Sequence, residues 1–167
     1  MKAERKYLAT YLDAAFDMTY AAPSYTRLGK DLEELTEELN PDIESRSNIL
    51  GENTVVHNGY EISSNADPYY YEYDDALAEK IMDIAMNRLT GDACRTTKVD
   101  VLLKPGATSD AAPTVVGAWR EDVYVIPNSV GGDTSGVQTP FTIHNAGNRV
   151  KGTFDLESKK FTAGSGL

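Results

Sequence analysis

The two histidines, the single cysteine and one pair of adjacent aspartates are the residues of this chain that could carry out catalysis. His57 and His144 could bind a metal ion, but a metal site needs three or four converging ligands, and nothing in their spacing predicts convergence. Cys94 has no second cysteine for a disulfide or a zinc pair. Asp74 and Asp75 precede an apolar stretch, where an aspartate serves as a helix N-cap. We therefore predict no catalytic residue, no metal ligand and no cofactor.

A glycine-rich segment, Asn128-Ser-Val-Gly-Gly-Asp-Thr-Ser-Gly, is the other feature that is typical of ligand binding. Glycine-rich loops cradle phosphate where they lead from a strand into the N-terminus of a helix. This segment instead lies between two expected strands, and it lacks the Lys-Ser/Thr ending of a phosphate-binding loop. We interpret it as a plain connecting loop.

Tyr69, Tyr70, Tyr71 and Tyr73 form a cluster just before an expected helix. Aromatic rings can stack on nucleic-acid bases, but such sites have cations around them, and the neighbours of these tyrosines are acidic. Tyrosine also supplies a large contact area at a small entropy cost, which favours a protein interface. The alternative is that one or two of the rings pack in the core.

The composition predicts a single acidic domain without a surface that binds nucleic acid. The 167 residues are 41% hydrophobic, which is enough for one core. The 26 Asp and Glu outnumber the 16 Lys and Arg, and the net charge of -10 opposes the clustered positive charge that phosphate binding requires. The sequence has neither a long apolar run that could span a membrane nor the apolar core of a signal peptide, so we expect a protein that is made and used without export.

Acidic residues gather between Asp31 and Glu44, with no Lys or Arg among them. Such a run is usually a solvated face. Repeated around the axis of a ring, however, the same face would line a channel with a negative potential that repels phosphate. The candidates for lining such a lumen are Glu33, Glu34, Glu37 and Glu38.

Turn signals and apolar periodicity predict a mainly β fold with one helix. Asn58-Gly59 lies between apolar stretches and predicts a hairpin with strands at 53–57 and 60–66. An apolar stripe from Leu77 to Leu89 predicts a helix over 75–90 that ends at Gly91. Further strands are expected at 98–104, at 115–126 with a kink at Gly117, at 137–144 and at 149–155, with a turn at 145–148 between the last two.

The ends of the single domain (1–167) are expected to lie outside its β core (25–155). Residues 1–24 contain a short apolar stretch and a proline, and we expect an arm there, whereas 156–167 is expected to be a polar tail. The interval 28–39 stays open between two structures. Its four leucines, Leu28, Leu32, Leu35 and Leu39, recur at helical spacing, whereas the nearby Pro41 and the dense acids favour an extended edge segment.

Two stretches, Asn48-Ile-Leu-Gly-Glu and Asn58-Gly-Tyr-Glu-Ile-Ser, precede the expected helix, and two others follow it, Arg120-Glu-Asp-Val-Tyr-Val-Ile-Pro and Asn148-Arg-Val-Lys-Gly-Thr-Phe-Asp. Taken with the single helix, they resemble the major tail tube proteins of long-tailed bacteriophages. The resemblance covers about residues 25–155, and it lies in the order of the elements more than in any invariant motif.

The resemblance implies a β-sandwich or barrel of the phage tail tube type, with one outward-facing helix and with an extended arm and loops for assembly. It implies hexameric rings that stack into the tube through which DNA is delivered, without a cofactor and without turnover. The acidic stretch 31–44 and the hairpin 53–66 would supply strands of the inner barrel, and 45–52 would be a stacking loop. Candidates for the subunit or ring-stacking interface are Asn48, Ile49, Leu50, Tyr69, Tyr70 and Tyr71.

The resemblance also implies the partners: further copies of the chain, a tape-measure protein in the lumen, and tail terminator and distal tail proteins at the two ends. DNA would pass through without specific binding, no membrane would be contacted, and the location would be the virion tail, assembled in the host cytoplasm. A contractile tail would add a sheath. Two alternatives stay open: a small carbohydrate-binding β-sandwich on a phage or cell-surface particle, with Trp119 and the tyrosines as sugar platforms, and a metal hydrolase that uses His57 and His144.

Overall fold

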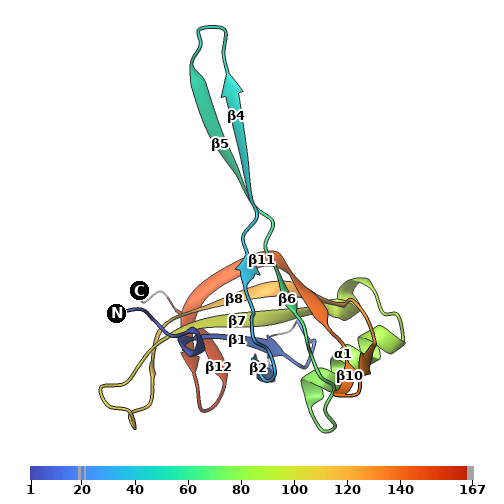
Figure 1. Cartoon of the computed structure of the whole chain (residues 1–167). Helices are drawn as coiled ribbons and strands as arrows, with labels where there is room; N and C mark the ends of the chain where they lie inside the picture. The colour runs from blue at the N-terminus through green and yellow to red at the C-terminus, as the bar shows by residue number, and fades with distance from the viewer. Residues whose placement is uncertain (19, 21, 165–167) are drawn as a thin grey trace.

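The computed structural model describes residues 1–18, 20 and 22–164, and it shows a curled, half-barrel β-sheet with one α-helix (Figure 1). The prediction of a mainly β fold with one helix is therefore confirmed. The strands are β1 (Leu8–Asp13), β2 (Tyr25–Leu28), β3 (Glu37–Glu38), β4 (Pro41–Ser47), β5 (Asn53–Tyr60), β6 (Ser63–Ala66), β7 (Arg95–Lys104), β8 (Thr114–Pro127), β9 (Gly131–Asp133), β10 (Gly136–Gln138), β11 (Phe141–Asp155) and β12 (Lys160–Ala163). The helices are α1 (Ala76–Met86) and the short 3-10 turns η1 (Arg5–Tyr7) and η2 (Gly91–Cys94).

The main sheet contains eight antiparallel strands in the order β2-β1-β7-β8-β11-β6-β3, with β12 paired to β11. Each face of this sheet carries an apolar core, and because side chains alternate along a strand, β1 and β8 contribute residues to both cores. The core on the helix side contains Leu12, Leu28, Tyr69, Leu77, Ile81, Val123, Val125, Phe141 and Ile143. The core on the other side contains Ala9, Tyr11, Tyr25, Val99, Val101, Leu103, Ala118 and Phe154.

Helix α1 confirms the predicted helix and its N-cap. The Asp75 carboxylate accepts hydrogen bonds from the backbone N–H groups of Leu77, at 3.1 Å, and Ala78, at 3.5 Å. The buried side of the helix lies against the first core, as the apolar stripe predicts. The helix ends at Met86 rather than near residue 90, because Arg88 adopts a positive φ of 53° that a right-handed helix does not allow.

The predicted hairpin turn at Asn58-Gly59 is wrong. Strand β5 continues through both residues and pairs with β4, and Asn58 is an extra residue at a bulge opposite β4. The turn lies instead at 48–52, where the Asn48 side chain accepts a hydrogen bond from the N–H of Glu52 at 3.0 Å and Gly51 takes a φ of 79°. The predicted second strand is β6, which leaves the hairpin and pairs with β11 and β3.

The helical reading of 28–39 is also wrong. Gly29 and Asp31 both have positive φ, which excludes a regular helix, and the strand residues of this interval are Leu28, at the end of β2, and the two residues of β3. Leu32 and Leu35 pack against the first core from this irregular segment, which accounts for their apolar spacing. The inner strand that the resemblance implies over 31–44 is present only in part, as β3 and the beginning of β4.

Strands β7 and β8 confirm the strands predicted at 98–104 and 115–126, and the register between them shifts beside Gly117. The strands predicted at 137–144 and 149–155 are a single strand, β11, and the turn predicted at 145–148 is wrong. Because β8 is long enough to pair with both halves, the Asn145-Ala-Gly-Asn segment forms two bulges within the ladder, with φ of 99° at Gly147. The glycine-rich segment 128–136 contains β9 and part of its hairpin partner β10.

Both predicted ends need correction. Within the expected N-terminal arm (1–24), strand β1 lies between β2 and β7 and is almost completely buried, so it belongs to the core of the sheet. Within the expected C-terminal tail (156–167), strand β12 pairs with β11 because Phe161 packs against the second core. Residues 19, 21 and 165–167 lie outside the described part of the chain.

Candidate functional site

The β4–β5 hairpin, residues 41–60, projects away from the body of the molecule, and we call it the projecting hairpin (Figure 1). All of its residues are exposed except Gly59, which is half-buried. A two-stranded hairpin is only marginally stable in water by itself, and exposed apolar side chains in number indicate an interaction surface. The exposed apolar side chains of this hairpin are Ile43, Ile49, Leu50, Val55, Val56 and Tyr60.

The tip of the projecting hairpin is the turn 48–52, which contains three of the predicted interface residues. Asn48 stabilises the turn, because its side-chain oxygen accepts hydrogen bonds from the backbone N–H groups of Leu50 and Glu52. Ile49 and Leu50 extend into solvent, with 103% and 76% of their reference surface exposed. The tip therefore presents two apolar side chains on a turn of defined shape, and a stacking role for it stays a prediction.

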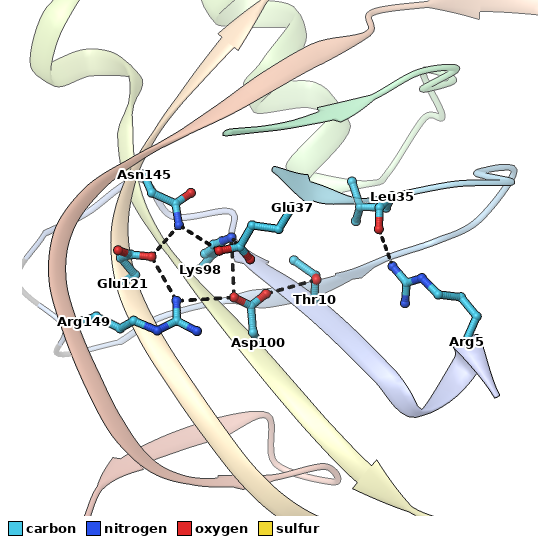
Figure 2. Close-up of polar contacts among 9 residues, drawn as sticks. All are labelled: Arg5, Thr10, Leu35, Glu37, Lys98, Asp100, Glu121, Asn145 and Arg149. Carbon is cyan, nitrogen blue, oxygen red and sulfur yellow. Dashed lines mark hydrogen bonds and ion pairs between the residues drawn. The ribbon is translucent and has the colours of Figure 1, made fainter. Parts of the chain in front are cut away.

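A cluster of buried charges includes Glu37, four residues before the projecting hairpin begins, and Figure 2 shows its side chains. Lys98 of β7 is at its centre, with 1% of its side chain exposed. Its Nζ lies 2.9 Å from Oε2 of Glu37 on β3 and 3.4 Å from Oδ2 of Asp100 on β7. The ion pair with Glu37 holds β3 against β7. It therefore also fixes the chain that leads into the projecting hairpin.

The other half of this ionic cluster comes from β8 and from the bulged part of β11 (Figure 2). Arg149 Nη1 lies 3.0 Å from Glu121 Oε2 and 3.7 Å from Asp100 Oδ2. The Asn145 amide donates to Glu121 and, at 3.4 Å, to Glu37. The Thr10 hydroxyl donates to Asp100 at 3.2 Å. The cluster thus combines two cations with three carboxylates.

Two carboxyl groups of the ionic cluster have pKa values that are shifted in opposite directions. Burial raises the pKa of Asp100, and the nearby Glu37 carboxylate adds to this effect. Burial acts on Glu37 in the same sense, but the contact with Lys98 outweighs it and holds the pKa of Glu37 below its ordinary value. Asp100 therefore takes up its proton more readily than an ordinary aspartate, and Glu37 less readily than an ordinary glutamate.

We expect carbon-detected NMR of the side-chain carboxyl groups to show these opposite shifts, with Asp100 titrating above the ordinary pKa of an aspartate and Glu37 below that of a glutamate. Because the folded state raises the pKa of Asp100, protonation of Asp100 stabilises the fold, and this stability is lost as the pH rises through the raised pKa. Because the folded state lowers the pKa of Glu37, its stabilisation is lost as the pH falls through the lowered pKa. Asp100→Asn should remove the titration of Asp100; a Glu37 resonance that titrates above the ordinary pKa of a glutamate contradicts the prediction.

The four glutamates that were candidates for a lumen are not equivalent. Glu37 is half-buried and bound to Lys98, so the prediction of a solvated carboxylate is wrong for this residue, because the curl of the sheet brings β3 over β7. Glu33, Glu34 and Glu38 are exposed in the chain segment that leads into the hairpin. For these three residues the lumen stays a prediction.

The tyrosine cluster divides between core and surface. Tyr69 is buried, with its ring edge-on to Phe141 at a centroid distance of 4.9 Å, and burial raises its pKa. An interface role for Tyr69 is therefore wrong, and the core alternative holds for it. Tyr70 and Tyr71 are half-buried, and Tyr73, edge-on to Tyr71 at 5.4 Å, is 85% exposed. An interface role for Tyr70 and Tyr71 stays a prediction.

The residues that could carry out catalysis lie on separate elements. His57 is exposed on the projecting hairpin, edge-on to Tyr60 at 4.7 Å, whereas His144 is exposed on β11 in the body. Cys94 is buried, and burial raises its pKa, which is typical of an inert thiol. Within the described ranges, no group of three His, Cys, Asp or Glu could hold a metal ion.

Trp119, the candidate sugar platform, is half-buried on β8 beside the ionic cluster. The cations of Arg149 and Lys151 lie 5.9 Å and 5.8 Å from its ring centroid. Its ring therefore serves in cation–π contacts within this chain.

Sequence reasoning missed Lys98, Asp100, Glu121 and Arg149 as members of a common site. The available signal was a run of alternating polar and apolar residues, Lys98-Val-Asp-Val, which is typical of a strand with one face in water. No helix in the described part of the chain is long and apolar enough to cross a membrane.

A scan against models of protein families finds no match, and a search of curated proteins finds no relative in sequence. Among solved structures, the chain is similar to one described as the sheath/tube terminator, in the extended state, of the PVC extracellular contractile injection system. The two chains are 10% identical, with a TM-score of 0.50, and the match covers 92% of this chain and 98% of that one. The likeness shows a shared fold, which is that of a tail-related particle component; it does not establish the major tail tube family.

Proposed function

We propose that this protein is a structural component of a phage tail or tail-like particle, and that it assembles into rings through the projecting hairpin without catalysing a reaction. One observation carries the proposal: a long hairpin, exposed along its whole length and rich in apolar side chains, extends from a body that has its own complete core. A fold shared with a component of a contractile injection system supports it at the level of analogy.

In a ring of identical copies, the hairpin of each copy can contact the neighbouring copy. A head-to-tail contact, in which the hairpin of one copy lies on the next copy, buries the exposed apolar side chains and leaves one hairpin free for the following copy. When the rotation between copies divides the circle, the contact closes, and no hairpin is left exposed. The number of copies per ring, six, comes from the resemblance to tail tube proteins.

In the first version of this function, the rings stack into a tail tube that conducts DNA, with a tape-measure protein in the lumen and with terminator and distal tail proteins at the ends. The exposed carboxylates of Glu33, Glu34 and Glu38 would then face the lumen, where they would keep phosphate from binding. The protein would be assembled in the host cytoplasm and would stay in the virion tail.

A second version is favoured by the structural neighbour, which is a sheath/tube terminator and matches this chain over nearly the full length of both. Here a single ring closes the end of the tube and contacts both the tube and, in a contractile particle, the sheath. Both versions require the same ring. They differ in whether rings of this chain stack on one another.

Electron microscopy of the purified full chain across a concentration series, with light scattering for mass, tests both versions. We expect rings with a central hole. Rings that grow into tubes as the concentration rises support the tail tube, whereas rings that never stack support the terminator. A chain that stays monomeric at every concentration contradicts the proposal and would turn attention to the carbohydrate-binding alternative.

A further inference from the structure

A groove of about 540 Å³ lies beside β2, which is the last strand at one edge of the sheet among the described residues. Its floor is apolar, because Leu8, Leu28, Leu32 and Leu35 contribute to its lining. Leu8 is exposed although its strand β1 lies between β2 and β7, because the pairing of β1 with β2 begins only at Thr10. The groove thus leaves apolar surface open to solvent beside an unpaired strand edge.

The rim of this groove is basic in a chain that is otherwise strongly acidic. Four of the chain's basic residues, Arg5, Lys6, Arg27 and Lys30, line it, against one acidic residue, Glu33. Their individual contacts show that the two lysines are paired with carboxylates, whereas the two arginines contact backbone carbonyls.

Arg5 donates to the backbone carbonyls of Leu8, at 2.5 Å, and Leu35, at 2.7 Å, and Arg27 donates to the carbonyl of Lys6, at 2.8 Å. Neither guanidinium has a carboxylate partner in the described part of the chain. The two lysines form exposed pairs with Glu4 and Glu72, and such pairs contribute little. A carboxylate from another molecule would therefore have the guanidinium groups of Arg5 and Arg27 to pair with here.

We propose that this groove receives the tip of the projecting hairpin from a second copy of the chain. The tip has the complementary chemistry: Ile49 and Leu50 would enter the leucine floor, and the Glu52 carboxylate would face the basic rim. This inference rests on the proposed function, and it names the surface that the hairpin contacts when the ring forms.

The tip cannot reach the groove of its own chain. Figure 1 shows the tip of the hairpin at one end of the molecule, and β2 lies in the body, beyond the base of the hairpin. The contact is therefore between copies, and it joins two different surfaces. Such a head-to-tail contact is the kind that a closed ring requires.

Cysteine cross-linking tests the contact. In the double variant Leu50→Cys, Lys30→Cys, one cysteine lies at the tip and the other at the rim, and the native Cys94 is buried. Cysteine is a small apolar residue, so it preserves the character of the tip at position 50. On mild oxidation we expect disulfide-linked oligomers in a non-reducing gel. The matched control Leu50→Cys, Lys104→Cys replaces an exposed lysine outside the groove, and it should give at least about tenfold less of the linked species.

A charge exchange gives an independent measurement in solution. Glu52→Lys and Lys30→Glu should each weaken self-association roughly three- to tenfold in sedimentation experiments at low salt, and the double variant should recover to within about twofold of the wild type. Rings that form normally while neither the cross-link nor the charge recovery occurs overturn this inference and leave the proposed function standing. Failure of the wild type to associate at all overturns both.

Discussion

Replacing Lys98 with methionine should lower the free energy of unfolding by about 3–5 kcal/mol, because it leaves buried carboxylates without their central cation. Glu37 and Asp100 both contact Lys98, and Glu121 lies in the same cluster. Among the described residues, Arg149 would then be the remaining cation of the cluster, and it pairs with Asp100 and Glu121 but not with Glu37. Methionine has a similar length and no charge, so little packing is lost. Urea denaturation followed by circular dichroism measures the effect.

Lys104→Met is the matched control, because Lys104 lies on the same strand β7 but is exposed and outside the cluster. It should change the free energy of unfolding by no more than about 0.5 kcal/mol. A second variant, Lys98→Met with Asp100→Asn, removes one carboxylate together with the cation and should recover part of the loss. A loss below about 1 kcal/mol for Lys98→Met would show that the cluster does not depend on this charge.

The elements that were predicted correctly are those that local periodicity determines. The stripe from Leu77 to Ile84 and the N-cap at Asp75 predict α1 without knowledge of any other segment. Strands β7 and β8 are likewise evident from their own β-branched residues. These features depend on residues a few positions apart.

The pairing of strands could not be predicted, because partners lie far apart in the sequence. Asn58-Gly59 and the turn 48–52 are both good turn sequences, and the choice depends on whether β5 pairs with β4 or with β6. The long partner β8 converts the turn-like segment 145–148 into bulges in β11. Both segments have sequences that favour a turn, but the pairing of their strands with a distant partner determines the structure that they adopt.

The ionic cluster could not be predicted from the sequence for the same reason. Lys98 and Asp100 alternate with Val99 and Val101, and in a sheet with one free face this pattern puts the charges in water. Here the sheet curls, and β3 and the bulged part of β11 cover that face (Figure 2). The cluster exists only once these remote segments are in place.

The position of the cluster links stability to assembly. Glu37 lies four residues before Pro41, where β4 begins, so its contact with Lys98 fixes the chain just before the projecting hairpin. The side-chain amide of Asn40, just before the hairpin, donates a hydrogen bond to the backbone carbonyl of Glu61, just after it, at 2.9 Å. This bond joins the two ends of the hairpin. A fixed base restricts the direction in which the hairpin projects, and this reduces the entropy cost of its contact with another copy.

Removal of the projecting hairpin should abolish self-assembly while the body stays folded. In the variant, residues 43–58 are replaced with Asn-Gly, which joins the paired residues Asp42 and Gly59 through a two-residue turn. Both cores and the ionic cluster lie outside the deleted segment, so we expect the free energy of unfolding to change by no more than about 1 kcal/mol. Light scattering should give the mass of a monomer at concentrations where the full chain forms rings.

The control is Ile49→Ser with Leu50→Ser, which keeps the hairpin and removes the apolar side chains of its tip. If the tip supplies the binding energy, this variant behaves like the deletion, because burial of each side chain contributes on the order of 1.5–3 kcal/mol. If the deletion abolishes assembly and the control does not, the strands of the hairpin, by pairing or by side contacts, hold the copies together. A deletion variant that still forms rings would mean that the hairpin has another partner, and the surface that closes the ring would then have to lie on the body.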